Sequence, residues 1–145
     1  MPNIMEDLKF KEERMAGASP RITFLLIADS FGLRESVKFS LREALPQVLV
    51  REAKDGAQVI SELIHQSIDL IFLDWETSWL DGRAFLRMIQ SDSRFAGKPV
   101  GILVDRLTPE LLREFHGHQS VWFMEKPVEA VELAEVARRF LDSTI

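Results

Sequence analysis

The chain has 145 residues, of which 46% are hydrophobic and 28% are charged, proportions that are ordinary for a soluble globular protein. Its formal net charge of -5 gives no electrostatic basis for binding nucleic acid, and the absence of cysteine excludes disulfides and cysteine-ligated metals. No apolar run approaches the ~20 residues that cross a bilayer, so we expect a cytoplasmic protein with neither a nucleic-acid nor a membrane partner.

Residues 1–20 are polar and precede the first strong strand pattern, so we predict an N-terminal extension followed by one domain over residues 21–145. A short helix over residues 4–15 and a mobile tail are both compatible with this segment. A chain of this length buries roughly 70% of the surface that it exposes when unfolded, which is enough for one stable core.

The first half of the domain alternates short apolar runs with segments of helical spacing. A continuous apolar run predicts a strand over residues 22–29, and the spacing that follows predicts a helix over residues 31–45. A second strand is predicted over residues 48–53, before a helix over residues 55–66. Residues 68–74 (IDLIFLD) form the third predicted strand, which is apolar on both faces and ends in an acid.

The second half repeats the alternation. Residues 81–92 predict a helix, residues 99–104 a fourth strand, and residues 108–116 a helix that opens on a Thr-Pro start signal. Residues 121–125 predict a fifth strand and residues 128–143 a final amphipathic helix. This pattern predicts an α/β fold, a doubly wound five-stranded parallel sheet with helices on both faces. The common order of such a flavodoxin-like sheet is 2-1-3-4-5.

Charged residues stand where three of the predicted strands end. Asp29 follows the first strand, Asp74 ends the third, and Lys126 follows the fifth. Ligands bind beyond the carboxyl ends of such strands, where the strand order reverses, so these side chains should meet at one crevice. Carboxylates there suit Mg²⁺, and a carboxylate can also attack phosphorus to give an aspartyl phosphate, with a lysine neutralising charge.

The ordered set of segments "FLLIADS", "EAKDG", "IFLDW", "PVGILV" and "EKP" resembles the receiver domain of two-component response regulators, close to the stand-alone chemotaxis type. The resemblance covers about residues 22–143. It implies a phosphorelay signalling module rather than an enzyme. It makes Asp74 the phospho-acceptor and Lys126 the residue that contacts the phosphoryl group. Asp29 and the backbone carbonyl of Glu76 would join Asp74 in holding Mg²⁺.

The same resemblance implies partners and a way of responding to them. A histidine kinase or a phosphotransfer protein would donate the phosphoryl group, and a downstream protein would bind the switched form. Phe123 stands where the family has an aromatic residue that swings inward on activation. The helix at 108–116, the strand at 121–125 and the helix at 128–143 would form the responding surface, which could also join two copies as a homodimer.

Two positions depart from the family pattern. The family usually carries two acids after the first strand, whereas this chain reads Ala28-Asp29. The family also ends the fourth strand with a Ser or Thr that hydrogen-bonds the phosphoryl group, whereas this chain has Val104, followed by the acid Asp105. A hydrogen bond to a charged group contributes roughly 1.5–3 kcal/mol. Moving a two-state protein from mostly inactive to mostly active needs about 5.5 kcal/mol of differential stabilisation. Losing that bond therefore weakens the response to phosphorylation.

These departures favour an alternative, a pseudo-receiver that binds partners or dimerises without phosphorylation. A flavin-binding domain of the same topology fits less well, because "DSFGLRE" after the first strand offers a single glycine to cradle a phosphate. Whether the chain is a stand-alone regulator or a receiver cut from a longer protein stays open. Trp75, Trp79 and Trp122 suggest packing or a partner surface, and His116 and His118 suggest exposed loop residues.

Overall fold

The ten predicted elements are all present in the computed structural model, which describes residues 22–141. The strands are β1 (Thr23–Ile27), β2 (Leu49–Ala53), β3 (Leu70–Asp74), β4 (Val100–Val104) and β5 (Val121–Glu125). The helices are α2 (Phe31–Ala44), α3 (Gly56–His65), α4 (Gly82–Ser91), α5 (Pro109–Glu114) and α6 (Ala130–Leu141). The predicted extension over residues 1–20 and the predicted end of the last helix, residues 142–143, lie outside the described residues.

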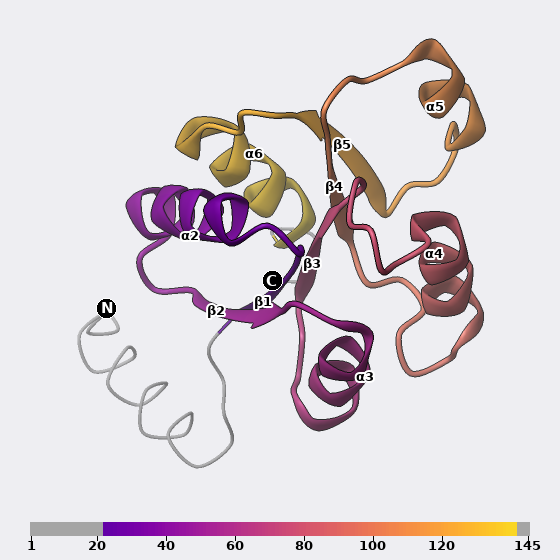
Figure 1. Ribbon diagram of the computed structural model, residues 1–145, viewed down its shortest axis with the longest axis horizontal. Coiled ribbons are helices and arrows are strands. Elements are labelled where there is room, and N and C mark those ends of the chain that lie inside the picture. The colour runs from indigo at the N-terminus through magenta and orange to yellow at the C-terminus, as the bar shows by residue number, and fades with distance from the viewer. Residues whose placement is uncertain (1–21, 142–145) are drawn as a thin grey trace, which may run out of the picture.

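The strands form one parallel sheet in the order β2-β1-β3-β4-β5, which confirms the predicted doubly wound fold. The helices α2 and α6 cover one face, and α3, α4 and α5 lie on the other, with α5 beyond the β5 edge (Figure 1). In β3 the side chains alternate between two cores. Leu70 and Phe72 pack towards α2 and α6, whereas Ile71 and Leu73 pack towards α3 and α4.

Polar caps set where four of the described helices begin, and they explain why α3, α4 and α5 each begin one residue later than predicted. The side chains of Ser30, Asp55, Asp81 and Thr108 each accept a hydrogen bond from a backbone amide in the first turn of the helix that follows. A capping residue has extended rather than helical backbone angles, so it stands outside the helix that it starts. The predicted Thr-Pro start at residue 108 is confirmed.

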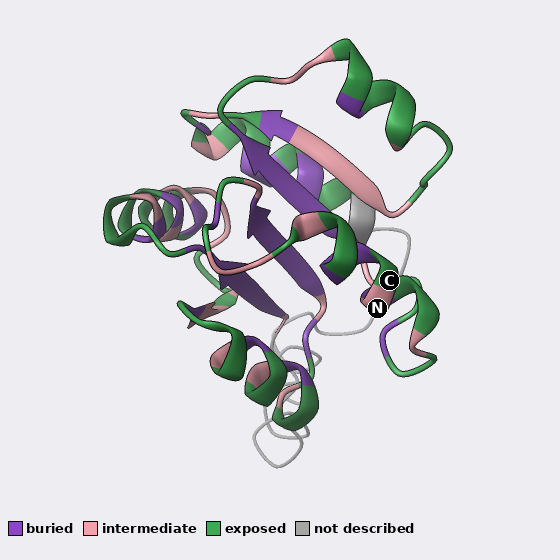
Figure 2. Cartoon of the chain, turned by 45° about the vertical axis from the view of Figure 1, so that its right-hand side comes forward, coloured by how far each residue is buried: buried purple, intermediate pink, exposed green. Residues whose placement is uncertain are grey.

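The two outer strands are less covered than the three inner ones. Every residue of β1, β3 and β4 is buried, whereas β5 is mostly half-buried (Figure 2). The strand β2, at the opposite edge, is buried only at Ala53. Within residues 22–141, no helix combines the length and the apolar character that a membrane span requires.

Gly101 in the middle of β4 allows the ring of Phe72 to lie against its backbone. A Cβ atom added at Gly101 would stand 2.9 Å from two ring carbons of Phe72. We expect Gly101→Ala to lower the free energy of unfolding by about 1–3 kcal/mol, because the ring is fully buried and has no room to shift. Urea unfolding followed by circular dichroism measures the loss.

Gly56 provides the matched control, since a Cβ atom there meets nothing within 4 Å. It opens α3, so Gly56→Ala should leave stability unchanged or raise it by up to about 1 kcal/mol. Equal losses in the two variants would contradict the packing explanation.

Candidate functional site

The carboxyl ends of four neighbouring strands bring the candidate site together. Residue pairs across the parallel ladders are Ile27 with Leu73, Asp74 with Leu103, and Val104 with Glu125. The residues that follow these positions therefore leave the sheet at the same edge. They include the three charged residues that were singled out at strand ends in the sequence, and Asp105 after β4.

Asp74 is buried at the end of β3 and is already hydrogen-bonded. Only 4% of its side chain is exposed, and its Oδ1 atom accepts hydrogen bonds from Lys126 Nζ at 2.6 Å and from the Glu76 amide at 3.1 Å. The Oδ2 atom accepts no hydrogen bond from the part of the chain that is described. One carboxylate oxygen of Asp74 is thus fixed in place by two hydrogen bonds.

Lys126 serves as the common counter-ion of three carboxylates. Its Nζ atom lies 2.6 Å from Asp74 Oδ1, 3.3 Å from Glu76 Oε2 and 3.2 Å from Asp105 Oδ1. Partial burial lowers the pKa of Lys126, but the hydrogen bonds to Asp74 and Asp105 outweigh this effect and raise the pKa above its ordinary value. The lysine is therefore a permanent cation at neutral pH. Its peptide bond to Pro127 is cis.

Asp29 contacts the loop after β3 through Ser78. The Asp29 Oδ2 atom accepts hydrogen bonds from the Ser78 hydroxyl at 2.7 Å and from the Ser78 amide at 3.1 Å. These two bonds lower the pKa of Asp29 below its usual value, so the carboxylate is ionised at neutral pH. Asp29 is exposed, and it reaches the loop that begins at Asp74.

The position of the missing acid is closed to solvent. Ala28 is fully buried, and its carbonyl accepts a hydrogen bond from Arg34 Nη1 at 2.9 Å. Arg34 is itself buried and forms an ion pair with Glu52 of β2. A methyl group therefore stands where the family pattern has its first acid, so the outer part of a metal site loses one carboxylate.

The donor atoms at this edge suit a hard divalent cation that keeps part of its water shell. Two carboxylates, Asp29 and Asp74, and the backbone carbonyl of Glu76 would offer oxygen atoms, the ligands that Mg²⁺ prefers. No three acidic or histidine side chains within residues 22–141 cluster closely enough to hold a metal ion by themselves. Mg²⁺ usually binds through one or two carboxylates and retains several waters, so the donor set fits this ion.

An aromatic cluster begins at Trp75, the residue that follows Asp74. The ring of Trp75 packs edge-on against Phe115 at 5.9 Å and Phe123 at 6.4 Å, measured between ring centroids. The guanidinium of Arg83 lies over the Trp75 ring, 5.2 Å from its centroid. Gly82 makes this close packing possible, because a Cβ atom there would stand 2.4 Å from the Trp75 ring.

The two predicted switch positions sit on neighbouring strands. Val104 at the end of β4 is fully buried and presents a methyl group in place of a hydroxyl. Phe123 of β5 is half-buried and contacts Trp75 and Phe115. The aromatic side chain that is expected to respond is therefore packed in the cluster that begins next to Asp74.

Two contacts could not be read from the sequence. Ser78 follows Asp74 by four residues, and nothing in its spacing indicates that it binds Asp29 across the edge. Asp105 could be read as an acid near the site, but the direction of its side chain is set by the loop after β4. The structure turns it towards Lys126.

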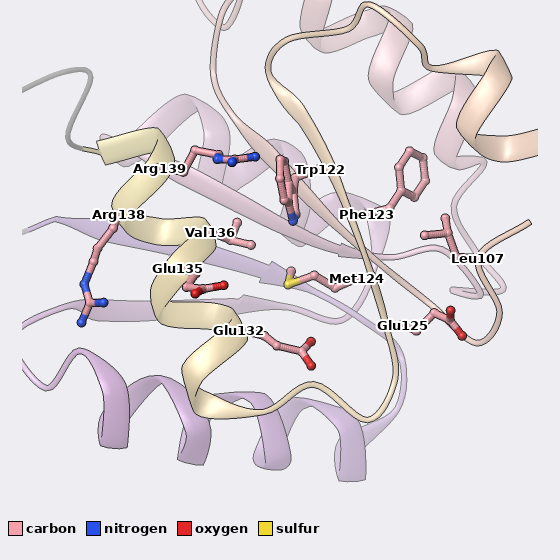
Figure 3. Close-up of a pocket in the computed structure, with 10 residues that line it drawn as sticks. All are labelled: Leu107, Trp122, Phe123, Met124, Glu125, Glu132, Glu135, Val136, Arg138 and Arg139. Atoms are coloured by element: carbon pink, nitrogen blue, oxygen red, sulfur yellow. The ribbon is translucent and has the colours of Figure 1, made fainter. Parts of the chain in front are cut away.

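A groove with a volume of about 680 Å³ lies along β5 and α6 (Figure 3). Trp122 stands at one end, with the guanidinium of Arg139 4.1 Å from its ring centroid. Glu132 and Glu135 of α6 and Leu107 of the loop after β4 also line it. Asp29, Asp74 and Lys126 do not line the groove, whereas Phe123 does, so the groove lies on the predicted responding face.

The chain is similar to known proteins over most of its length. The family model described as "Response regulator receiver domain" matches residues 24–138. The response regulator Rre1 of Synechocystis sp. is 29% identical over 121 residues, which cover 83% of this chain and 52% of Rre1. The chain therefore spans about half the length of that relative.

Solved structures show the same fold. The chemotaxis response regulator CheY4 of Vibrio cholerae matches 83% of this chain and 98% of its own at 21% identity, with a TM-score of 0.71. The receiver domain of a DNA-binding response regulator from Colwellia psychrerythraea matches the same shares of the two chains at 17% identity, with a TM-score of 0.75. At these identities the likeness concerns the fold.

Proposed function

The chain belongs to the family of response regulator receiver domains of two-component signalling, and from this premise we propose that it accepts a phosphoryl group on Asp74. The observation that carries the proposal is the hydrogen bond of 2.6 Å between Lys126 Nζ and the buried Asp74 carboxylate at the ligand-binding edge of the sheet. In the proposed organisation, residues 21–145 form the receiver and residues 1–20 an extension, in a cytoplasmic protein.

The proposed donor is a histidine kinase or a phosphotransfer protein that carries a phosphohistidine. An Asp74 carboxylate oxygen attacks the phosphorus atom, the phosphorus–nitrogen bond breaks, and the imidazole leaves and takes a proton from solvent. The ammonium of Lys126 stabilises the charge on the phosphoryl oxygens.

Receiver domains generally bind Mg²⁺ at this site, and the ion supplies further neutralisation of the transferring group. Asp29, Asp74 and the carbonyl of Glu76 would hold it. The bonds from Ser78 fall on a single oxygen of Asp29 and leave its other oxygen for this role.

The phosphorylated form would change how a downstream protein, or a second copy of the chain, binds to α5, β5 and α6. The groove of Figure 3 supports this choice of surface, because it combines apolar side chains with both acidic and basic ones. Leu107 lines the groove and lies three residues after Val104, so the loop after β4 connects the acceptor site to this surface.

The test of this proposal is phosphorylation by a small donor. Incubation with Mg²⁺ and acetyl phosphate should add about 80 Da to the intact mass, the mass of one phosphoryl group. The gain should disappear when Mg²⁺ is chelated and in Asp74→Asn, which keeps the shape of the side chain and removes the nucleophile. Asp69→Asn, outside the site on the segment before β3, should keep the gain.

A second candidate function is a pseudo-receiver that binds partners without a chemical switch. It is favoured by the buried methyl groups of Ala28 and Val104 at two positions where the family pattern has polar groups. No mass gain at saturating acetyl phosphate, together with no binding of the phosphoryl mimic beryllofluoride, would decide in its favour.

A further inference from the structure

Lys126 already contacts three carboxylates in this structure, two through hydrogen bonds and one through an ion pair. An ammonium carries three donors, and Lys126 has three carboxylate partners, on Asp74, Glu76 and Asp105. A phosphoryl group on Asp74 that is held by Lys126 therefore competes for this ammonium with the carboxylates of Glu76 and Asp105.

Asp105 is the partner most easily displaced. Its side chain is 68% exposed, whereas that of Glu76 is 40% exposed and that of Asp74 is 4% exposed. The amide of Asp105 also donates a hydrogen bond to Glu76 Oε1, at the long distance of 3.5 Å. We call this bond and the Asp105–Lys126 ion pair together the loop tether, because they fasten the loop after β4 to the acceptor site.

Both parts of the loop tether depend on the charges of the unmodified site. A phosphorylated residue carries about -1.5 to -2 charge, more than the carboxylate that it replaces. This charge competes with Asp105 for Lys126 and repels the Asp105 carboxylate. Val104, the neighbouring residue, has no hydroxyl with which the loop could bind the phosphoryl group in exchange.

Resting on the function proposed above, we propose that the loop tether holds the loop after β4 inward before phosphorylation, and that phosphorylation of Asp74 releases it. Asp105 is thus an internal competitor for Lys126. The loop then moves away from the site rather than towards it. Because Leu107 belongs to this loop and lines the groove along β5, the release reshapes the groove at the same time.

Hydrogen–deuterium exchange of the backbone, read by mass spectrometry, tests the direction of this movement. Beryllofluoride with Mg²⁺ serves as the phosphoryl mimic, and ¹⁹F resonances of the bound mimic report its occupancy. We expect amides between Asp105 and Leu107 to exchange faster once the mimic is bound. Slower exchange in this segment, with the mimic bound, would overturn the inference while leaving the proposed acceptor role of Asp74 intact.

Two variants examine the loop tether both at rest and with the mimic bound. Asp105→Asn removes the charge with little change in shape, so exchange in residues 105–107 should be fast at rest and unchanged by the mimic. The same variant should bind beryllofluoride roughly tenfold more tightly, since a charge-assisted competitor is gone. Glu110→Gln, which removes a negative charge from the exposed start of α5, should behave like the unmodified chain.

Unchanged resting exchange in Asp105→Asn would overturn the inference whatever the mimic does. Absence of mimic binding in the unmodified chain would overturn the proposed function, and this inference with it. In the double variant Val104→Thr, Asp105→Ala, the hydroxyl is restored and the competitor removed, so the mimic should slow exchange in the loop. Faster exchange in that variant would contradict the role assigned to Asp105.

Discussion

Phosphorylation of Asp74 by acetyl phosphate should slow on the order of 10²-fold when Lys126 is replaced by methionine, the loss that follows removal of one preorganised group that stabilises transition-state charge. Methionine has a side chain of similar length without the charge. The variant leaves Asp74, Glu76 and Asp105 without their common counter-ion. The initial rate of mass gain at fixed Mg²⁺ measures the effect.

A second measurement separates a loss of transfer from a loss of the site. Mg²⁺ affinity, measured by calorimetric titration, should be kept or increased in Lys126→Met, because removing a cation concentrates the negative charge that attracts Mg²⁺. Lys54→Met, at an exposed lysine after β2, should change neither quantity. An unchanged rate in Lys126→Met would contradict the role of the lysine in transfer.

Replacing Phe72 with alanine should lower the free energy of unfolding by about 3–5 kcal/mol, the range for large aromatic side chains lost from a core. Phe72 is fully buried in β3, two residues before Asp74, and packs edge-on against Phe24 with ring centroids 5.6 Å apart. Neighbouring strands fix the backbone at Gly101, so the cavity has little means of closing. Guanidinium unfolding followed by circular dichroism gives the value.

Phe39→Ala is the matched control for this prediction, because the ring of Phe39 is 63% exposed on α2. It should cost less than about 0.5 kcal/mol, as surface substitutions usually do. If the two alanine variants lost similar amounts, the assignment of Phe72 to the core between the sheet and α6 would be wrong.

The fold was predictable because the local spacing of apolar residues distinguishes the strands from the helices. The continuous apolar run that ends at Asp74 is long enough for a buried strand and too short for a helix, and Thr108 with Pro109 marks a helix start. The ends of the elements were less accurate. Ile22 and Ala28 continue the apolar pattern of β1, for example, although the regular ladder covers only Thr23–Ile27.

Only those parts of the candidate site that stand at strand ends could be predicted from the sequence. Parallel strands bring Asp74 and Lys126 to one edge whatever the loops do, and the structure places these two side chains in contact. The contacts of Ser78 and Asp105 depend on loop conformation, which has no periodicity to read. Their roles therefore emerge only from the three-dimensional structure.

The site takes its members from nearly the whole described chain, from Asp29 after the first strand to Lys126 after the last. Asp74 and Lys126 are separated by 52 positions, and the strand β5, which Lys126 directly follows, pairs only with β4. During synthesis, Asp74 therefore leaves the ribosome well before Lys126. A chain that is unfinished, or clipped before β5, contains Asp74 without the lysine that contacts it in the complete structure.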